Sequence, residues 1–161
     1  MPDITQALAQ TGQPMAFFKA LETQVQETIG VKLFTTMVID YDRGVVKRNY
    51  TNMPDAYPVS GEKPMRENAW SEQVQGRFET FVANSIEEIA EVFPDYELIQ
   101  SLGCESCLNL PIVINGAVLG TLNCLHDAGY YTPERVAAAE TLKQVGACAF
   151  LLDAALKGKT S

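Results

Sequence analysis

The dipeptide Asn115-Gly116 constrains the fold of this chain more than any other feature. It separates two apolar runs, residues 108–114 and 117–125. A two-residue type I′ turn needs a positive φ angle at both central positions, and Asn followed by Gly suits that requirement best. The two runs are therefore predicted to form a β-hairpin.

An unbroken register in this hairpin predicts which side chains share a face of the sheet. Cys107 then lies opposite Cys124, and Asn109 lies opposite Leu122. Alternation along the strands produces one aliphatic face, with Leu108, Leu110, Ile112, Ile114, Leu119 and Leu125. It also produces a mixed face, with Cys107, Asn109, Val113, Val118, Leu122, Cys124 and His126.

The rest of the chain alternates between helical and strand patterns. A helix is predicted over residues 13–29 and a first hairpin over 32–41 and 45–51. After a loop (52–70), we expect a short helix (70–76), a strand (77–83), helices starting after Ser85 and Asp95, and a long helix that Thr132 caps and that continues to about residue 156. Gly146, Ala147 and Ala149 in that last helix permit close approach of another helix.

Composition narrows the class of protein. The chain has 161 residues, with 12 Lys and Arg against 20 Asp and Glu, which gives a net charge of −8. Such a field repels phosphate backbones and anionic lipids, so we expect neither nucleic acid nor membrane as a partner. The start has no signal-peptide pattern and no run approaches the roughly 18 apolar residues of a membrane span, which favours a cytoplasmic location. The 4 cysteines do not suggest a disulfide scaffold in that compartment.

Several segments together resemble the GAF domain, a small-molecule sensor module related to PAS. They are residues 33–37, the Ser-Cys-Leu-Asn-Leu-Pro-Ile run 106–112, Asn115-Gly116, the Leu-Gly-Thr-Leu-Asn run 119–123, and the Tyr-Thr-Pro-Glu run 131–134. The resemblance implies an α+β fold: a six-stranded antiparallel sheet with long terminal helices on one face, and a small-molecule pocket under short helices and loops on the other. It assigns residues 13–157 to one GAF-like domain, 1–12 to an N-terminal extension and 158–161 to a C-terminal tail.

The resemblance also implies a function. The chain is expected to bind a small organic ligand and to act as a sensor or signalling module. No output domain is recognised in it, so it would act through a partner or as a homodimer formed by its terminal helices. The mixed sheet face would turn Cys107, Asn109, Cys124 and His126 towards the ligand pocket. The aromatic residues Tyr50, Tyr57, Trp70 and Phe81 are candidates to line the same pocket.

The cysteines leave a second class of function open. Cys104, Cys107, Cys124 and His126 form a C-x2-C-x16-C-x-H pattern that resembles the spacing of a zinc site. Some GAF proteins are free methionine-R-sulfoxide reductases, which suggests a thiol-dependent redox enzyme as a further alternative. Their cysteines lie earlier in the chain, where residues 81–100 hold none here. No catalytic residue or cofactor is assigned, and a binding module is favoured over an enzyme.

Charge is distributed unevenly along the chain. Residues 78–134 contain nine acidic residues and no Lys or Arg. This segment should build much of the pocket, so a neutral or cationic ligand is expected. An anionic ligand would depend on basic residues from elsewhere, namely Lys47, Arg48, Lys63, Arg66 and Arg77.

Overall fold

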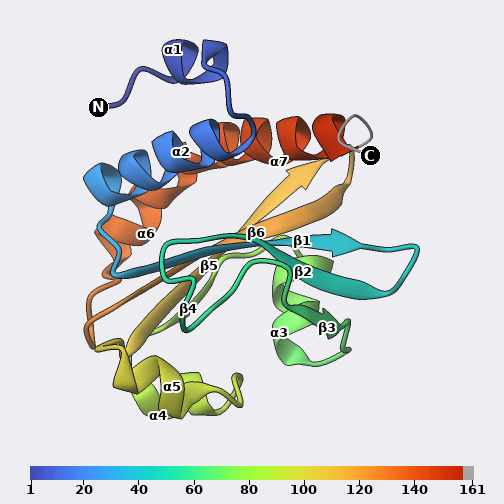
Figure 1. Cartoon of the computed structure of the whole chain (residues 1–161). Helices are drawn as coiled ribbons and strands as arrows, with labels where there is room; N and C mark the ends of the chain where they lie inside the picture. Colours follow the sequence, from blue (N-terminus) through green and yellow to red (C-terminus); the bar gives the residue numbers. More distant parts are fainter. Residues whose placement is uncertain (158–161) are drawn as a thin grey trace.

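A six-stranded antiparallel sheet forms the centre of the computed structural model, which describes residues 1–157 (Figure 1). The strands follow the order β3-β2-β1-β6-β5-β4. Their bounds are β1 (Leu33–Asp40), β2 (Val45–Thr51), β3 (Glu62–Pro64), β4 (Phe81–Ala83), β5 (Ser106–Ile114) and β6 (Ala117–His126). Both predicted hairpins and the predicted α+β class are therefore confirmed, whereas the short edge strand β3 lies in a segment predicted to be a loop. The tail predicted for 158–161 lies outside the described residues.

One face of the sheet is covered by the terminal helices (Figure 1). These are α2 (Met15–Thr28), α6 (Pro133–Ala139) and α7 (Lys143–Lys157), and a 3₁₀ turn at Glu140–Leu142 divides the helix that was predicted to be continuous. Phe17, Phe18 and Leu21 of α2 pack with Phe150 of α7 in the main core. The short helix α1 (Ile4–Ala9) adds the buried Ala7 to this core.

The opposite face carries short helices and loops. They are α3 (Ala69–Ser71), a π-helical turn (Glu72–Gly76), α4 (Ile86–Ala90) and α5 (Tyr96–Ser101). Ser85 caps α4 by accepting a hydrogen bond from the backbone N–H of Glu88, as predicted. Asp95 precedes α5 but caps no backbone N–H with its side chain. A second, smaller core lies on this face, around Ile89, Ile99 and Cys107.

A β-bulge changes the register of the β5–β6 hairpin. The turn is as predicted, with φ angles of 52° at Asn115 and 77° at Gly116, but Leu119 is an extra residue between the Val113–Val118 and Ile112–Gly120 pairs. An extra residue reverses the faces of every later side chain. The predicted pairing of Cys107 with Cys124 and of Asn109 with Leu122 is therefore wrong. Cys107 pairs with Leu125, and Asn109 pairs with Asn123.

Strand β6 therefore presents to each layer the side chains that were predicted to face the other layer. Leu122 and Cys124 join the core under the terminal helices, together with Leu108 and Leu110 of β5. Leu125 joins the smaller core on the other face. The aliphatic and mixed faces are thus confirmed for β5, and they are reversed for β6 between the bulge and its C-terminal end.

A second irregularity occurs in β2. Thr36 of β1 pairs with Tyr50, but the next residue, Met37, pairs with Arg48, so Asn49 is skipped. Tyr50 and Arg48 would share a face in a regular strand. Here Tyr50 packs under the terminal helices, stacked on Phe18 with ring centroids 5.3 Å apart. Arg48 is left on the face with the short helices.

Candidate functional site

A cavity of about 390 Å³ lies between the sheet and the short-helix layer. Its apolar wall comes from strands β1 and β6, from the segment that joins α4 to α5, and from α5 itself. The residues are Leu33, Met37, Ile39, Leu125, Val92, Phe93 and Ile99. Trp70 and Gln75, from α3 and the π-helical turn, line it as well. Ligand sites are commonly concave, largely apolar and of this size.

The cavity has a polar floor where β5, β6 and β1 lie side by side. Asn109 Nδ2 donates to Asn123 Oδ1 at 2.8 Å, Thr121 Oγ1 donates to the same oxygen at 2.9 Å, and Asn123 Nδ2 donates to Thr35 Oγ1 at 3.3 Å. Trp70 Nε1 donates to Asn109 Oδ1 at 3.0 Å. Each amide nitrogen carries two hydrogens, and among residues 1–157 Asn109 Nδ2 and Asn123 Nδ2 each donate one hydrogen bond, which leaves one N–H group of each amide without a partner.

One side of the cavity holds a charged group that is almost fully buried. Arg48 is 9% exposed, and its guanidinium lies 4.8 Å from the centre of the Tyr57 ring. The Tyr57 hydroxyl donates to Asp95 Oδ2. Burial raises the pKa of Tyr57 well above its ordinary value, and the bond to Asp95 raises it further. Two buried atoms in this group have no hydrogen-bond partner, Arg48 Nε and Asp95 Oδ1.

Two exposed cations complete the charged part of the lining. Lys63 of β3 pairs with Val46 of β2, and both line the cavity. Arg66 follows two residues after the end of β3 and lines it too. Asp95 is the sole carboxylate among the lining residues. The acidic segment 78–134 therefore supplies one charge to the cavity, and its other eight acidic residues do not line it.

The structure brings together half of the residues predicted for the site. Tyr57, Trp70, Cys107 and Asn109 line the cavity. Phe81 packs beside it, edge-on against Phe93, with ring centroids 6.3 Å apart. Tyr50 and Cys124 lie on the helix-covered face because of the two bulges, so the prediction that they face the cavity is wrong.

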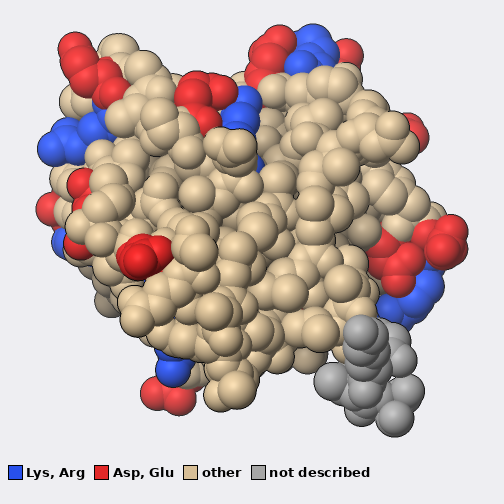
Figure 2. All heavy atoms as spheres, turned by 90° about the horizontal axis from the view of Figure 1, so that it is seen from above, with Lys and Arg blue, Asp and Glu red and all other residues tan. Residues whose placement is uncertain are grey.

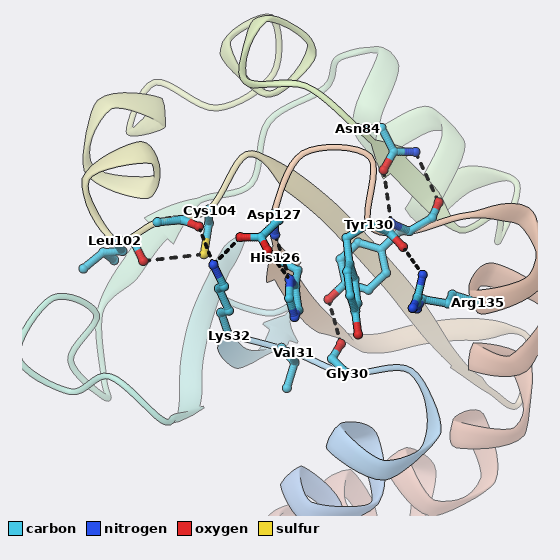
Figure 3. Close-up of polar contacts among 12 residues, drawn as sticks. Gly30, Val31, Lys32, Asn84, Leu102, Cys104, His126, Asp127, Tyr130 and Arg135 are labelled. Carbon is cyan, nitrogen blue, oxygen red and sulfur yellow. Dashed lines mark hydrogen bonds and ion pairs between the residues drawn. The ribbon is translucent and has the colours of Figure 1, made fainter.

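His126 lies at the end of β6 (Figure 3), and it is not among the residues that line the cavity. Its ring stacks on the ring of Tyr130 with centroids 3.4 Å apart. The guanidinium carbon of Arg135 lies 4.0 Å from the centre of the same Tyr130 ring. The backbone N–H of Asp127 donates to His126 Nδ1 at 2.8 Å. Burial lowers the pKa of His126. The neutral ring thus ties the end of the sheet to the segment before α6.

The cysteine pattern does not assemble into a metal site. Cys107 lies on the cavity face and Cys124 on the helix-covered face, so the sheet separates them. Within residues 1–157, no cluster of three His, Cys, Asp or Glu side chains could hold a metal ion. Figure 3 shows Cys104 near Lys32, which binds Asp127 and the Gly103 carbonyl.

The thiols also lack the environment of a nucleophile. Burial raises the pKa of Cys107 to about 12, and it raises the pKa of Cys104 and Cys124 as well. A reactive thiol needs a lowered pKa and access to solvent. All three are buried and free, so the geometry provides no support for the redox alternative.

The sequence patterns did not predict several of the residues that line the cavity. Arg48, Asp95, Thr121 and Asn123 were not assigned to the ligand site, although Arg48 was named as a possible cation. Gly120 was the available signal, because a Gly inside a strand pattern indicates a bulge or a close backbone approach. A Cβ atom at Gly120 would lie 2.0 Å from the Met37 carbonyl oxygen of β1.

An antiparallel sheet with terminal helices on one face and a cavity under short helices on the other defines a class of α+β sensor domains. This chain belongs to the GAF domain family, whose model matches residues 4–150. The family is one of small-molecule-binding sensor and signalling domains. No curated protein matches the chain. No helix among residues 1–157 is long and apolar enough to cross a bilayer.

Solved structures share the fold at low sequence identity. The GAF domain of a two-component sensor histidine kinase from Bacillus halodurans has a TM-score of 0.68 and 14% identity, over 91% of this chain and 98% of that one. The GAF domain from a phosphoenolpyruvate-protein phosphotransferase of Coxiella burnetii has a TM-score of 0.68 and 20% identity, over 97% of this chain and 91% of that one. The chromophore-binding domain of a bacteriophytochrome from R. palustris has a TM-score of 0.66 and 13% identity, over 94% of this chain and 60% of that one. These likenesses establish the fold alone.

Proposed function

We propose that this chain is a GAF-type sensor that binds a small organic molecule in the cavity under its short helices. The observation that carries the proposal is the cavity itself, about 390 Å³ in volume, with an apolar wall and a polar floor. The spare N–H groups of Asn109 and Asn123 would fix the orientation of a ligand, and the apolar wall would provide most of its contact area. A cytoplasmic location is part of the proposal, and the free cysteines support it.

Binding in the cavity can reach the rest of the molecule through the β5–β6 hairpin. Cys107 and Asn109 lie on its cavity face, while Leu108 and Leu110 lie under the terminal helices. A ligand that moves this hairpin therefore also moves the packing of α7, which contacts both β5 and β6. In the proposed function, the terminal helices pass this change to a second copy or to another protein.

We propose that a second copy of the chain packs on the terminal helices. Figure 2 views the molecule from that side and shows a broad area without Asp, Glu, Lys or Arg across the middle, with charged side chains gathered towards its edge. Exposed apolar side chains lie on the helices of this layer: Leu151 is 51% exposed, Met15 42% and Leu8 41%. Gly146 does not serve a second helix, because it faces Ile112 and Leu122 of its own sheet.

The single tryptophan provides the test of ligand binding, since Trp70 lines the cavity. The protein is screened against a metabolite library by thermal shift, because a ligand of the native state raises its apparent stability. A molecule that binds in the cavity should raise the midpoint and also change Trp70 emission. Gln75→Phe fills the cavity from the π-helical turn and should weaken both responses, whereas Gln100→Phe on the exposed side of α5 should not. Ligands that act equally on both variants would contradict the proposed site.

The second copy is tested by light scattering on the purified protein. The wild type should give twice the monomer mass, and Leu151→Glu should give the monomer because it places a charge in the apolar surface. Leu98→Glu is the matched control, since Leu98 is 39% exposed on α5, at the opposite side of the sheet. A monomeric wild type at high concentration would refute the dimer.

A further inference from the structure

We infer that the cavity binds an organic acid. The anionic group of this ligand binds Arg48, Lys63 and Arg66, and its apolar body packs against the apolar wall of the cavity. This inference rests on the proposed function, and it adds the chemical class of the ligand. Four observations carry it: the buried Arg48, the balance of charge in the lining, the spare donors of the floor and the composition of the wall.

Arg48 is a buried cation that forms no direct ion pair within the described residues, although the charge of Asp95 lies near enough to act on its pKa. Its Nη1 donates to the Pro58 carbonyl at 3.1 Å, and its Nε has no partner. Among residues 1–157, no carboxylate forms an ion pair with Arg48. Burial lowers the pKa of Arg48 and the charge of Asp95 raises it by a smaller amount, but a guanidinium stays protonated in proteins. A buried charge is costly unless it is paired and hydrogen-bonded, and a carboxylate matches the fork of a guanidinium.

Asp95 does not fill this role. Its Oδ2 accepts from the Tyr57 hydroxyl, and Arg48 meets the face of the same ring. Tyr57 thus stands between the two charges and holds each in place by a different part of its side chain. The Arg48 guanidinium remains available to an anion on its cavity side.

The balance of the lining also favours an anion. Arg48, Lys63 and Arg66 are three cations against the one carboxylate of Asp95. The floor adds N–H donors from Asn109 and Asn123. A site this rich in donors is satisfied by a ligand rich in acceptors. We therefore replace the neutral or cationic ligand expected from the sequence, since most of the acidic segment on which that expectation depended does not line the cavity.

The apolar wall of the cavity determines the chemical nature of the rest of the ligand. Leu33, Met37, Ile39 and Phe93 line the same cavity as Arg48. With about 390 Å³ available, an aromatic ring or a short aliphatic chain attached to the acid fits this composition. The lining therefore favours an apolar body with one acidic end.

The test uses two probes that share one shape, 3-phenylpropionate and its uncharged primary amide, 3-phenylpropionamide. Binding to the full chain is measured by calorimetry and by Trp70 emission. The acid should bind about tenfold more tightly than the amide, because it gains charged hydrogen bonds. Arg48→Gln should remove that preference. Since Arg48 is buried and its variant can fail to fold, the double variant Lys63→Gln/Arg66→Gln is tested in parallel.

The double variant alters exposed residues, so its fold should be unchanged. It should weaken acid binding about fivefold and leave amide binding as it was. Lys47→Gln is the control, because Lys47 is on the same strand as Arg48 but lines a separate hollow; it should have no effect on either probe.

Equal affinity for acid and amide would overturn the inference and leave the proposed function intact. An equal loss in Lys47→Gln and in the double variant would also overturn it, because the effect would then reflect net charge alone. If neither probe binds, the inference fails for acids of this size, and the proposed function fails only if the metabolite screen also finds no molecule that changes Trp70 emission.

Discussion

Removing the Tyr57 hydroxyl should destabilise the fold by an amount that the structure allows one to derive. Tyr57 is 7% exposed, and its hydroxyl is the partner of Asp95 Oδ2. Asp95 Oδ1 is already buried without a partner, so Tyr57→Phe leaves the whole carboxylate without a hydrogen bond. A hydrogen bond to a charged group contributes roughly 1.5 to 3 kcal/mol. The absence of any second partner places the expected loss at about 2.5 kcal/mol.

The measurement is the free energy of unfolding in urea, accompanied by thermal unfolding. A loss of this size lowers the melting temperature by about 5 to 10 °C in a chain of this length. Tyr96→Phe is the matched control, because the Tyr96 hydroxyl lies 3.4 Å from Glu97 Oε1 at the surface; it should cost less than about 0.5 kcal/mol. The reasoning is refuted if Tyr57→Phe costs no more than the control, since Asp95 would then have another partner.

Three further predictions concern the hairpin and the end of the sheet. Gly120→Ala should cost about 3 kcal/mol of unfolding free energy, because its Cβ would meet the Met37 carbonyl oxygen; Gly76→Ala, with neighbours no nearer than 4.0 Å, should cost nothing, and equal effects would contradict the close approach. Gly116→Ala should cost about 1 kcal/mol in the same assay, because its φ angle is 77°; no loss would mean that the turn relaxes. Burial lowers the pKa of His126 from 6.5, so the unfolded chain binds more protons and stability should fall as pH decreases through about 6.5. His126→Gln should lack that slope between about pH 8 and about pH 5, and an unchanged slope would refute the assignment.

Local rules explain why much of the fold could be predicted. The Asn115-Gly116 turn, the Ser85 and Thr132 caps and the apolar stripe of α2 depend on residues close together in sequence. Turn geometry and helix capping are set by such neighbours. The resemblance to GAF domains rested on motifs of the same kind, and it supplied the arrangement of layers that periodicity alone does not provide.

The membership of the site was less predictable, because it depends on two bulges. A bulge shifts the register of strand pairing by one residue and turns every later side chain to the other face. Asn49 is skipped in β2, which sends Arg48 to the cavity and Tyr50 to the helices. Leu119 is the extra residue in β6, which sends Asn123 to the cavity and Cys124 to the helices.

The sequence by itself determined most of the helices, both hairpins, the family and half of the predicted cavity residues, because those features follow from neighbouring side chains. The tertiary structure decided which charges meet in the cavity. Gly120 lies against the backbone of β1, and Arg48, Tyr57 and Asp95 meet from three separate segments. Contacts between residues far apart in the chain set these positions, so no local pattern could have revealed that an acidic chain encloses a cavity with more cations than carboxylates.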